Sequence, residues 1–250
     1  MTTPQFDDIV YEVDGPAAIV TLNRPHRYNA FRGQTIEELI AAFRAAWADK
    51  SVRAVILTGA GDKAFCTGGD VKQRAETGDY GPTASGLFEI DAFHKLIRDI
   101  PKPVIAAVNG LAIGGGHVFH VLCDLTIASE TARFGQVGPR VGSFDAGFGT
   151  TYLARVIGEK RAREMWFLCR QYDAATAERW GLVNVVVPEV VTSPPKAIFN
   201  VPPEPKARLV TVSVYVCRFQ VPPSVTAVPL GNALFTPDTS VPLLILVAPP

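Results

Sequence analysis

Two glycine-rich stretches decide the fold: Ala64-Phe-Cys-Thr-Gly-Gly-Asp70 and Asn109-Gly-Leu-Ala-Ile-Gly-Gly-Gly116. Each follows a short apolar run typical of a buried strand, at 54–58 and 104–108, and each is expected to lead into a helix. Glycine lets the backbone approach a ligand closely and frees its N–H groups to point at that ligand. Two such groups that converge would form an oxyanion hole for an enolate or a tetrahedral oxyanion. Either stretch alone is also compatible with an ordinary turn.

Outward from these stretches, strands alternate with helices along the chain, which predicts an α/β fold. The predicted strands cover 8–13, 17–22, 54–58, 104–108, 125–128 and 183–187. The predicted helices start at Thr35 and cover 87–100, 114–122, 147–156, 160–169 and 174–180. The spacing of Ile36, Leu39, Ile40 and Phe43 is that of an amphipathic helix.

Composition excludes several classes of protein. The chain has 250 residues, with 24 basic residues balanced by 24 acidic ones, so a basic surface for nucleic acid is not expected. No apolar run reaches the roughly 18 residues that a membrane span needs. The polar start of the chain and its four scattered cysteines favour a reducing cytoplasm. The dinucleotide fingerprint and the P-loop motif are both absent from the sequence.

Proline usage divides the chain near Pro188. The 13 prolines from Pro188 onward are most of the 20 in the chain, whereas only one of the 21 glycines lies there. Because proline blocks helix interiors and central strands, residues 189–250 are interpreted as an atypical Pro-rich tail after a core at 1–188. A frameshifted end and a genuine extension both remain open as explanations.

Several motifs together carry a family resemblance over about three quarters of the chain, from Phe6 to Pro188. The chain resembles the crotonase (enoyl-CoA hydratase/isomerase) superfamily. The motifs are Asn23-Arg-Pro, Asn29-Ala-Phe, Ala64-Phe-Cys-Thr-Gly-Gly-Asp70, Pro101-Lys-Pro-Val-Ile-Ala, and Gly114-Gly-Gly with Cys123-Asp124.

The resemblance implies a spiral of ββα turns that assembles as a homotrimer or a homohexamer. It also implies that the N–H groups of Gly69 and Gly115 bind the carbonyl oxygen of an acyl-CoA thioester. Coenzyme A then enters as part of the substrate, and no tightly bound cofactor or metal is expected. His117 and His120, three residues apart, are interpreted as packing residues because no third metal ligand is placed.

The catalytic glutamates of the family's hydratases are missing. Val118 and Gly138 stand at their two positions. Adding water to an enoyl group needs proton-transfer groups, so a simple hydratase is not expected. Phe134-Gly-Gln-Val-Gly-Pro-Arg-Val-Gly-Ser-Phe-Asp-Ala-Gly147 instead resembles two relatives with ring chemistry. One is 1,4-dihydroxy-2-naphthoyl-CoA synthase of menaquinone biosynthesis, a lyase that closes a ring by an intramolecular Claisen condensation. The other is 2-ketocyclohexanecarboxyl-CoA hydrolase, which opens one.

That resemblance implies roles for named residues. Ser143 and Asp145 would bind the substrate and assist proton transfer, and Tyr80 would contact it. Bicarbonate would be held as a base, at a site made by Gln136, Gly138 and Trp166. Five further residues would wrap the thioester arm of coenzyme A: Thr67, Gly68, Asp70, Val71 and Leu111.

The sequence departs from the family pattern after Pro188. Relatives carry helices there that cap the active site, bring a Tyr and a Lys to the substrate and build the oligomer. The Pro-rich tail offers no matching helix. Three alternatives to the synthase reading therefore stay open: the ring hydrolase, a family member of reduced activity, and an inactive core that only binds acyl-CoA.

Overall fold

The computed structural model describes residues 6–145, 147–190, 216–217 and 243–244. The chain divides into two units, residues 1–211 and 212–250, each of which is described by itself. In the second unit, β11 (Val216–Cys217) pairs antiparallel with β12 (Leu243–Leu244). The rest of the predicted tail beyond residue 190 lies outside the described residues.

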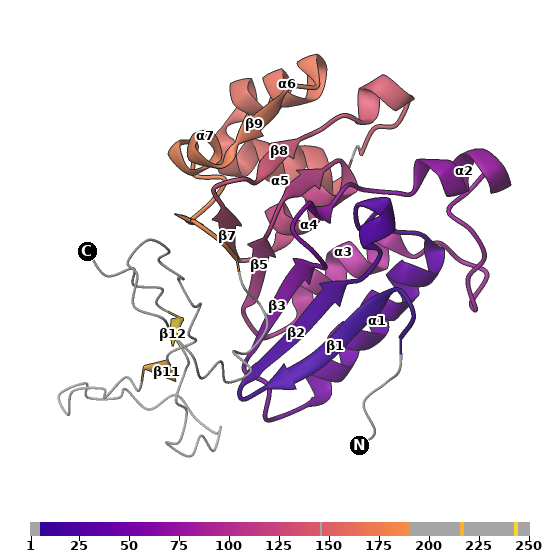
Figure 1. The fold of residues 1–250 in the computed structure, drawn as a ribbon, viewed down its shortest axis with the longest axis vertical. Helices are drawn as coiled ribbons and strands as arrows, with labels where there is room; N and C mark the ends of the chain where they lie inside the picture. The colour runs from indigo at the N-terminus through magenta and orange to yellow at the C-terminus, as the bar shows by residue number, and fades with distance from the viewer. Residues whose placement is uncertain (1–5, 146, 191–215, 218–242, 245–250) are drawn as a thin grey trace, which may run out of the picture. The chain divides into compact units, whose positions relative to one another are not determined.

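The first unit is built on a six-stranded sheet (Figure 1). Its order is β1 (Ile9–Asp14), β2 (Ala17–Leu22), β3 (Ala54–Gly59), β5 (Val104–Val108), β7 (Leu125–Ser129) and β10 (Val185–Val187). The first pair is antiparallel and every later pair is parallel. All five residues of β5 are buried, as expected for a central strand covered on both faces.

The first unit also contains a second, separate sheet of four short strands. Its order is β4 (Ala64–Cys66), β6 (Leu111–Ile113), β8 (Arg133–Gly135) and β9 (Gln171–Asp173), with only the last pair antiparallel. The chain repeatedly passes from the large sheet to the small sheet and then into a helix, as in β5, β6 and α4 (Gly115–Leu122). This repeat confirms the predicted α/β spiral of ββα turns.

The helices agree with the predictions except at some ends. They are α1 (Gly33–Ala48), α2 (Val71–Thr77), α3 (Ile90–Asp99), α4, α5 (Phe148–Ile157), α6 (Glu159–Leu168) and α7 (Ala174–Arg179), with 3-10 turns η1 (Pro25–Arg27) and η2 (Gly138–Val141). The helix predicted at 87–100 starts only at Ile90. The strand predicted from Val183 starts at Val185, because the Val183 N–H bonds back to the Ala177 carbonyl.

An aromatic column connects the helices to the glycine turns. Phe43 on α1 meets Phe93 on α3 edge to face, with ring centroids 5.2 Å apart. Phe93 meets Phe119 on α4 at 5.1 Å, and Phe119 meets Phe31 at 5.2 Å. All four rings are buried, so packing in the core fixes where Phe31 lies. Within the described ranges, no helix is long and apolar enough to cross a membrane.

Candidate active site

The first glycine turn follows β4 and is held in place by Phe31. The Phe31 N–H donates to the Gly68 carbonyl, and the Asp70 N–H donates to the Phe31 carbonyl, both at 2.8 Å. Gly68 has φ of +88°, a left-handed conformation that favours glycine. These two bonds flank Gly69 and leave its own N–H without an acceptor among the described residues.

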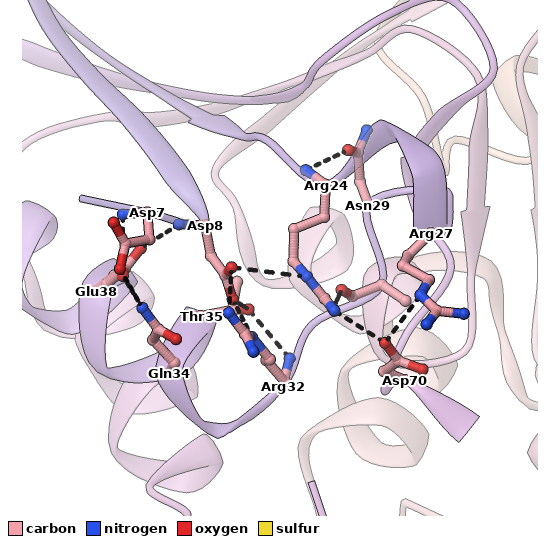
Figure 2. A network of polar contacts seen from close by, with 11 residues as sticks. Asp7, Asp8, Arg24, Arg27, Asn29, Arg32, Gln34, Thr35, Glu38 and Asp70 are labelled. Carbon is pink, nitrogen blue, oxygen red and sulfur yellow. Dashed lines mark hydrogen bonds and ion pairs between the residues drawn. The ribbon is translucent and has the colours of Figure 1, made fainter. Parts of the chain in front are cut away.

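A network of ion pairs holds the same turn through Asp70, its last residue (Figure 2). The Arg24 guanidinium donates to Asp70 Oδ2 at 3.0 Å, and Arg27 lies 4.0 Å from the same oxygen. Burial alone would raise the pKa of Asp70, but hydrogen bonds from the Gln73 N–H and Arg24, with the nearby arginine charges, hold that pKa below its usual range. Asp70 also caps α2 by accepting from the N–H groups of Lys72 and Gln73.

The network extends to the start of β1. Arg32 donates to both carboxylate oxygens of Asp8, at 2.7 and 2.9 Å, and the Thr35 hydroxyl donates to Asp8 Oδ2 at 2.6 Å. Arg24 lies 3.7 Å from Asp8, so this single guanidinium joins Asp8 to Asp70 (Figure 2). The same guanidinium also donates to the carbonyl of Ala30, the residue before Phe31.

The second glycine turn joins β6 to α4 and packs directly on the first turn. Gly114 has φ of +57°, and Gly115 is the first residue of α4. An ideal Cβ on Gly68 would lie 2.9 Å from the Gly115 nitrogen, and one on Gly115 would lie 2.6 Å from the Phe31 ring. Only glycines therefore let the two turns approach each other this closely.

The arrangement fits the oxyanion hole that the resemblance implies. Like Gly69, Gly115 has an N–H with no hydrogen-bond acceptor in the described part of the chain. It also stands at the N-terminus of α4, where the helix dipole favours negative charge. The structure thus brings together both glycines that the sequence indicated, at one place and with unpaired donors.

Tyr80 lies over this place. An ideal Cβ on Gly69 would be 2.2 Å from Tyr80 Cε1, so the phenol ring covers that glycine. The ring stacks on Phe88 at 4.7 Å, and the Tyr80 carbonyl accepts from the Gly33 N–H at 2.8 Å. Tyr80, which the resemblance implies as a substrate contact, therefore lies next to Gly69.

The Asp145 carboxylate lies at the N-terminus of α5. Its Oδ1 accepts from the N–H groups of Gly147 and Gly149, at 3.0 and 3.2 Å. An ideal Cβ on Gly149 would lie 3.0 Å from the Asp145 carboxyl carbon and 2.9 Å from Val118 Cγ2. The carboxylate is therefore next to Val118, which is buried on α4 one turn after Gly115.

Gly138 and Trp166, predicted together, do lie together. An ideal Cβ on Gly138 would be 3.7 Å from the Trp166 ring and 2.4 Å from the Ser143 carbonyl oxygen. The Ser143 N–H also donates to the Gly138 carbonyl at 2.9 Å. Trp166 Nε1 is buried with no hydrogen-bond partner among the described residues. Its ring lines a cavity of about 310 Å³ with Phe144.

Gln136 is almost fully buried, and its amide contacts His117 rather than Trp166. The Gln136 Nε2 to His117 Nδ1 distance is 3.1 Å. Burial lowers the pKa of His117 to about 3, so its ring is neutral. The third member of the predicted anion site is thus held by a neutral histidine on α4.

The other predicted residues border the two turns. Val71 is exposed at the start of α2, whereas Thr67 and Leu111 are half-buried. The Thr67 hydroxyl donates to the Tyr28 carbonyl at 3.3 Å. The Asp70 side chain is bound by Arg24 and by the α2 cap, and its backbone N–H and carbonyl are bonded to Phe31 and Arg74.

Sequence reasoning missed the buried partners of these residues. Arg24 and Phe31 lie inside the quoted motifs, but no role was assigned to them. His94, on the buried face of α3, lies in the helix predicted at 87–100 and was given no role. Its signal was a titratable side chain at a position where the helical spacing expects an apolar one.

A spiral of ββα turns whose two glycine turns meet is the arrangement expected of enzymes that stabilise a negatively charged carbonyl oxygen. The model of the enoyl-CoA hydratase/isomerase family matches residues 13–196. The chain therefore belongs to the enoyl-CoA hydratase/isomerase, or crotonase, family.

Solved structures agree with this assignment. An enoyl-CoA hydratase from Bacillus anthracis is 34% identical, with a TM-score of 0.66 over 73% of this chain and 70% of that one. An enoyl-CoA hydratase subunit I from Geobacillus kaustophilus is 35% identical, with a TM-score of 0.65 over 74% and 71%. An enoyl-CoA hydratase/carnitine racemase from Magnetospirillum magneticum is 32% identical, with a TM-score of 0.64 over 73% and 68%. These neighbours carry hydratase names, so they support the family and not the predicted ring-closing reaction within it.

Proposed function

We propose that this protein closes a ring in an acyl-CoA thioester by an intramolecular Claisen condensation, as 1,4-dihydroxy-2-naphthoyl-CoA synthases do. The observation that supports this best is the place of Asp145. Its carboxylate lies beside Val118, where the family's hydratases carry a glutamate. Gly138 stands at the position of the second hydratase glutamate and packs against Ser143 and Trp166. The site thus offers one protein carboxylate for proton transfer where a hydratase has two.

The two glycine turns would bind the thioester. The N–H groups of Gly69 and Gly115 donate to the thioester oxygen and stabilise it as negative charge develops on it. This makes the α-proton easier to remove and gives an enolate. The enolate carbon attacks a carbonyl carbon of the same acyl group, so that a C–C bond forms and the C=O electron pair becomes an alkoxide.

The attacked carbonyl would belong to a carboxyl group. Asp145 would protonate the alkoxide to a gem-diol, and loss of one water molecule would then give the ketone of the closed ring. Asp145 Oδ1 is held by two backbone N–H groups, which leaves Oδ2 to carry the proton. The Ser143 hydroxyl, on the same half-buried loop, would orient the reacting oxygen. Tyr80 would cover the thioester and keep water away from the enolate.

The residues around Trp166 fit a small anion such as bicarbonate. Trp166 Nε1 is a buried donor without a partner in the described part of the chain, and Gly138 packs close to the Trp166 ring. Gln136 would complete the site, with its amide held by His117. Bound bicarbonate would supply the general base that removes the α-proton.

A second candidate is opening of a ring by the reverse kind of C–C chemistry, as in 2-ketocyclohexanecarboxyl-CoA hydrolase. Val137, between Gln136 and Gly138, and the Asn29-Ala-Phe-Arg32 stretch match that enzyme better than the synthase. The same oxyanion hole and the same Asp145 would serve this reaction. We also propose that the chain assembles as a homotrimer or homohexamer.

The test presents three substrates to the purified protein. They are the open-chain aryl acyl-CoA precursor of 1,4-dihydroxy-2-naphthoyl-CoA, 2-ketocyclohexanecarboxyl-CoA and a short trans-2-enoyl-CoA, with products followed by chromatography. We expect ring closure of the first. Asp145→Asn should lower this turnover by about 10²–10⁴-fold, the usual contribution of a general acid or base. Asp91→Asn, a matched change on the exposed face of α3, should not.

Thioester binding separates loss of chemistry from loss of the site. Asparagine still offers an oxygen to the Gly147 and Gly149 N–H groups, so Asp145→Asn should bind the CoA thioester as the unchanged protein does. Full turnover in Asp145→Asn would contradict the role of Asp145. Efficient hydration of the enoyl-CoA, with no ring chemistry, would overturn the proposed function.

A further inference from the structure

We propose that His94 is a positioning residue for Asp145: its neutral ring donates an N–H hydrogen bond to the free carboxylate oxygen when an acyl-CoA occupies the site. This inference rests on the proposed role of Asp145 in proton transfer. It assigns His94 no contact with the substrate and no net transfer of a proton.

His94 is a buried polar side chain without a partner. Only 4% of the residue is exposed, and neither ring nitrogen has a hydrogen-bond partner among the described residues. The other two buried histidines each use one nitrogen, His117 toward Gln136 and His120 toward Thr126. A neutral imidazole always carries one N–H, and leaving such a group unsatisfied costs about 1–3 kcal/mol. An apolar residue would avoid that cost, so packing alone does not explain a histidine here.

The surroundings of His94 lead to Asp145. The ring lies against Phe119 of α4 at 5.7 Å and against Phe148, the first residue of α5, at 5.3 Å. The Asp145 carboxylate binds the backbone at this same end of α5. Both of its hydrogen bonds go to Oδ1, and Oδ2 accepts none within the described ranges. The His94 ring, whose N–H has no acceptor, and Asp145 Oδ2, which has no donor, therefore both lie at the start of α5.

The charges acting on His94 fit this pairing. Burial lowers its pKa, while Asp145 first and Asp91 second act in the opposite direction. Asp91 is exposed on α3 itself, and neither Phe119 nor Phe148, which pack on the ring, can titrate. The ring is therefore neutral at working pH, so it can donate an N–H without adding a charge to the site.

Ligand binding supplies the reason for the bond to form. Asp145 is half-buried and can be hydrated before an acyl-CoA enters. An acyl group that covers it would remove that water, and the carboxylate would then need a donor from the protein. Catalytic hydrogen bonds are often long in a free enzyme and shorten in the complex. A bond from His94 would stabilise the negative charge that develops on Asp145 as it gives up its proton, and would hold Oδ2 toward the reacting oxygen.

The first test needs no turnover. The chain has four histidines, so ¹⁵N NMR of the imidazoles is simple to assign by single substitutions. We expect acetoacetyl-CoA to shift one ring ¹⁵N–H resonance of His94 toward a hydrogen-bonded value. The shift should be lost in Asp145→Ala and retained in Asp91→Ala. An unchanged shift in Asp145→Ala, or no shift in the unchanged protein at saturating thioester, would overturn the proposal.

The second test measures kcat and KM on the substrate that the protein accepts. His94→Leu should lower kcat by about tenfold, since a hydrogen bond to the Asp145 carboxyl group is lost. His94→Gln keeps an N–H donor and should restore most of kcat, with KM unchanged throughout. Equal losses of kcat in His94→Leu and His94→Gln would mean a packing role and overturn the proposal. If the unchanged protein turns over no acyl-CoA, the proposed function fails while the NMR arm still decides this inference.

Discussion

Two buried polar regions of the first unit differ in whether their side chains have hydrogen-bond partners. Behind the first glycine turn, Asp8, Arg24, Arg32 and Asp70 are all joined by ion pairs and hydrogen bonds (Figure 2). Around α4 and the Asp145 loop, the buried polar groups include three histidines and a tryptophan. Together these hold five of the six buried side-chain nitrogen and oxygen atoms that have no partner among the described residues.

We interpret the ion-paired region as structural support and the region of unpaired neutral side chains as part of the proposed site. A charge can be buried only when it is paired, so the network beneath Asp70 holds one arrangement of the backbone. A neutral ring can be buried with an atom unpaired at a smaller cost, and that atom remains free for a ligand or for a neighbour that moves. Most of the unpaired neutral atoms therefore lie on α3, α4 and α6, the helices around the proposed site.

The largest effect should come from breaking the paired region. Arg24→Met removes the guanidinium shared by Asp8 and Asp70 and leaves buried carboxylates short of a partner. We expect the free energy of unfolding to fall by about 3–5 kcal/mol, measured by urea denaturation. Arg27→Met is the matched control, because Arg27 is partly exposed and 4.0 Å from Asp70, and should cost about 1 kcal/mol or less. Equal losses in the two variants would refute the claim that Arg24 holds the network together.

The sequence predicted the features that depend only on residues close together in the chain. Buried strands such as 104–108 and the start of α4 follow from apolar runs and glycines, and the structure places both as expected. The four strands of the small sheet were missed because three residues are too few to show alternation. The pairing of Gly69 with Gly115 was reached through the family resemblance, because spacing alone does not bring two turns together.

The partners of site residues could not be predicted, since they depend on contacts distant in sequence. Arg24 and Asp70 are 46 positions apart, and neither position has a local pattern that selects the other. Phe31 is an ordinary apolar residue until the fold places its ring over Gly115. His94 reads as a minor interruption of an amphipathic helix, and only burial shows that its nitrogens lack partners.

The next effect concerns an unpaired donor. Trp166→Phe keeps an aromatic ring against Phe144 and removes only the Nε1 donor and part of the ring. If Nε1 binds an anion, turnover should fall about 10–100-fold, and its dependence on added bicarbonate should weaken, because a hydrogen bond to a charged group is worth about 1.5–3 kcal/mol. Unfolding free energy should change by much less than in Arg24→Met.

A bicarbonate titration of the ring-closing rate measures this. Trp47→Phe, at an exposed position on α1, serves as the control for a generic loss of indole. A rate independent of bicarbonate in the unchanged protein would remove Gln136, Gly138 and Trp166 from the mechanism. A titration curve in Trp166→Phe that matches the unchanged protein would show that Nε1 does not contact the anion.

The smallest effect is a change in how stability depends on pH. Burial lowers the pKa of His117 to about 3, and burial together with His117 lowers that of His120 well below its ordinary value. In the unfolded chain both titrate near pH 6.5, so between these values the unfolded state binds protons that the folded state refuses. The free energy of unfolding therefore includes the full contribution of both rings above about pH 6.5. It falls as the pH drops, by up to about 1.4 kcal/mol per pH unit for each ring.

His120→Gln should flatten this dependence by the contribution of one ring. The amide can still pair with Thr126, so the change removes the titration with little loss of packing. Urea denaturation between pH 6.5 and 5 isolates the histidines, because the lowered pKa values of Asp8 and Asp70 place the loss of their contribution at more acidic pH. His26→Gln, at an exposed position, should leave the slope unchanged. If His120→Gln also leaves it unchanged, His120 is protonated in the folded protein and the buried histidine region is not neutral; the contrast with the ion-paired region would then fail at this residue.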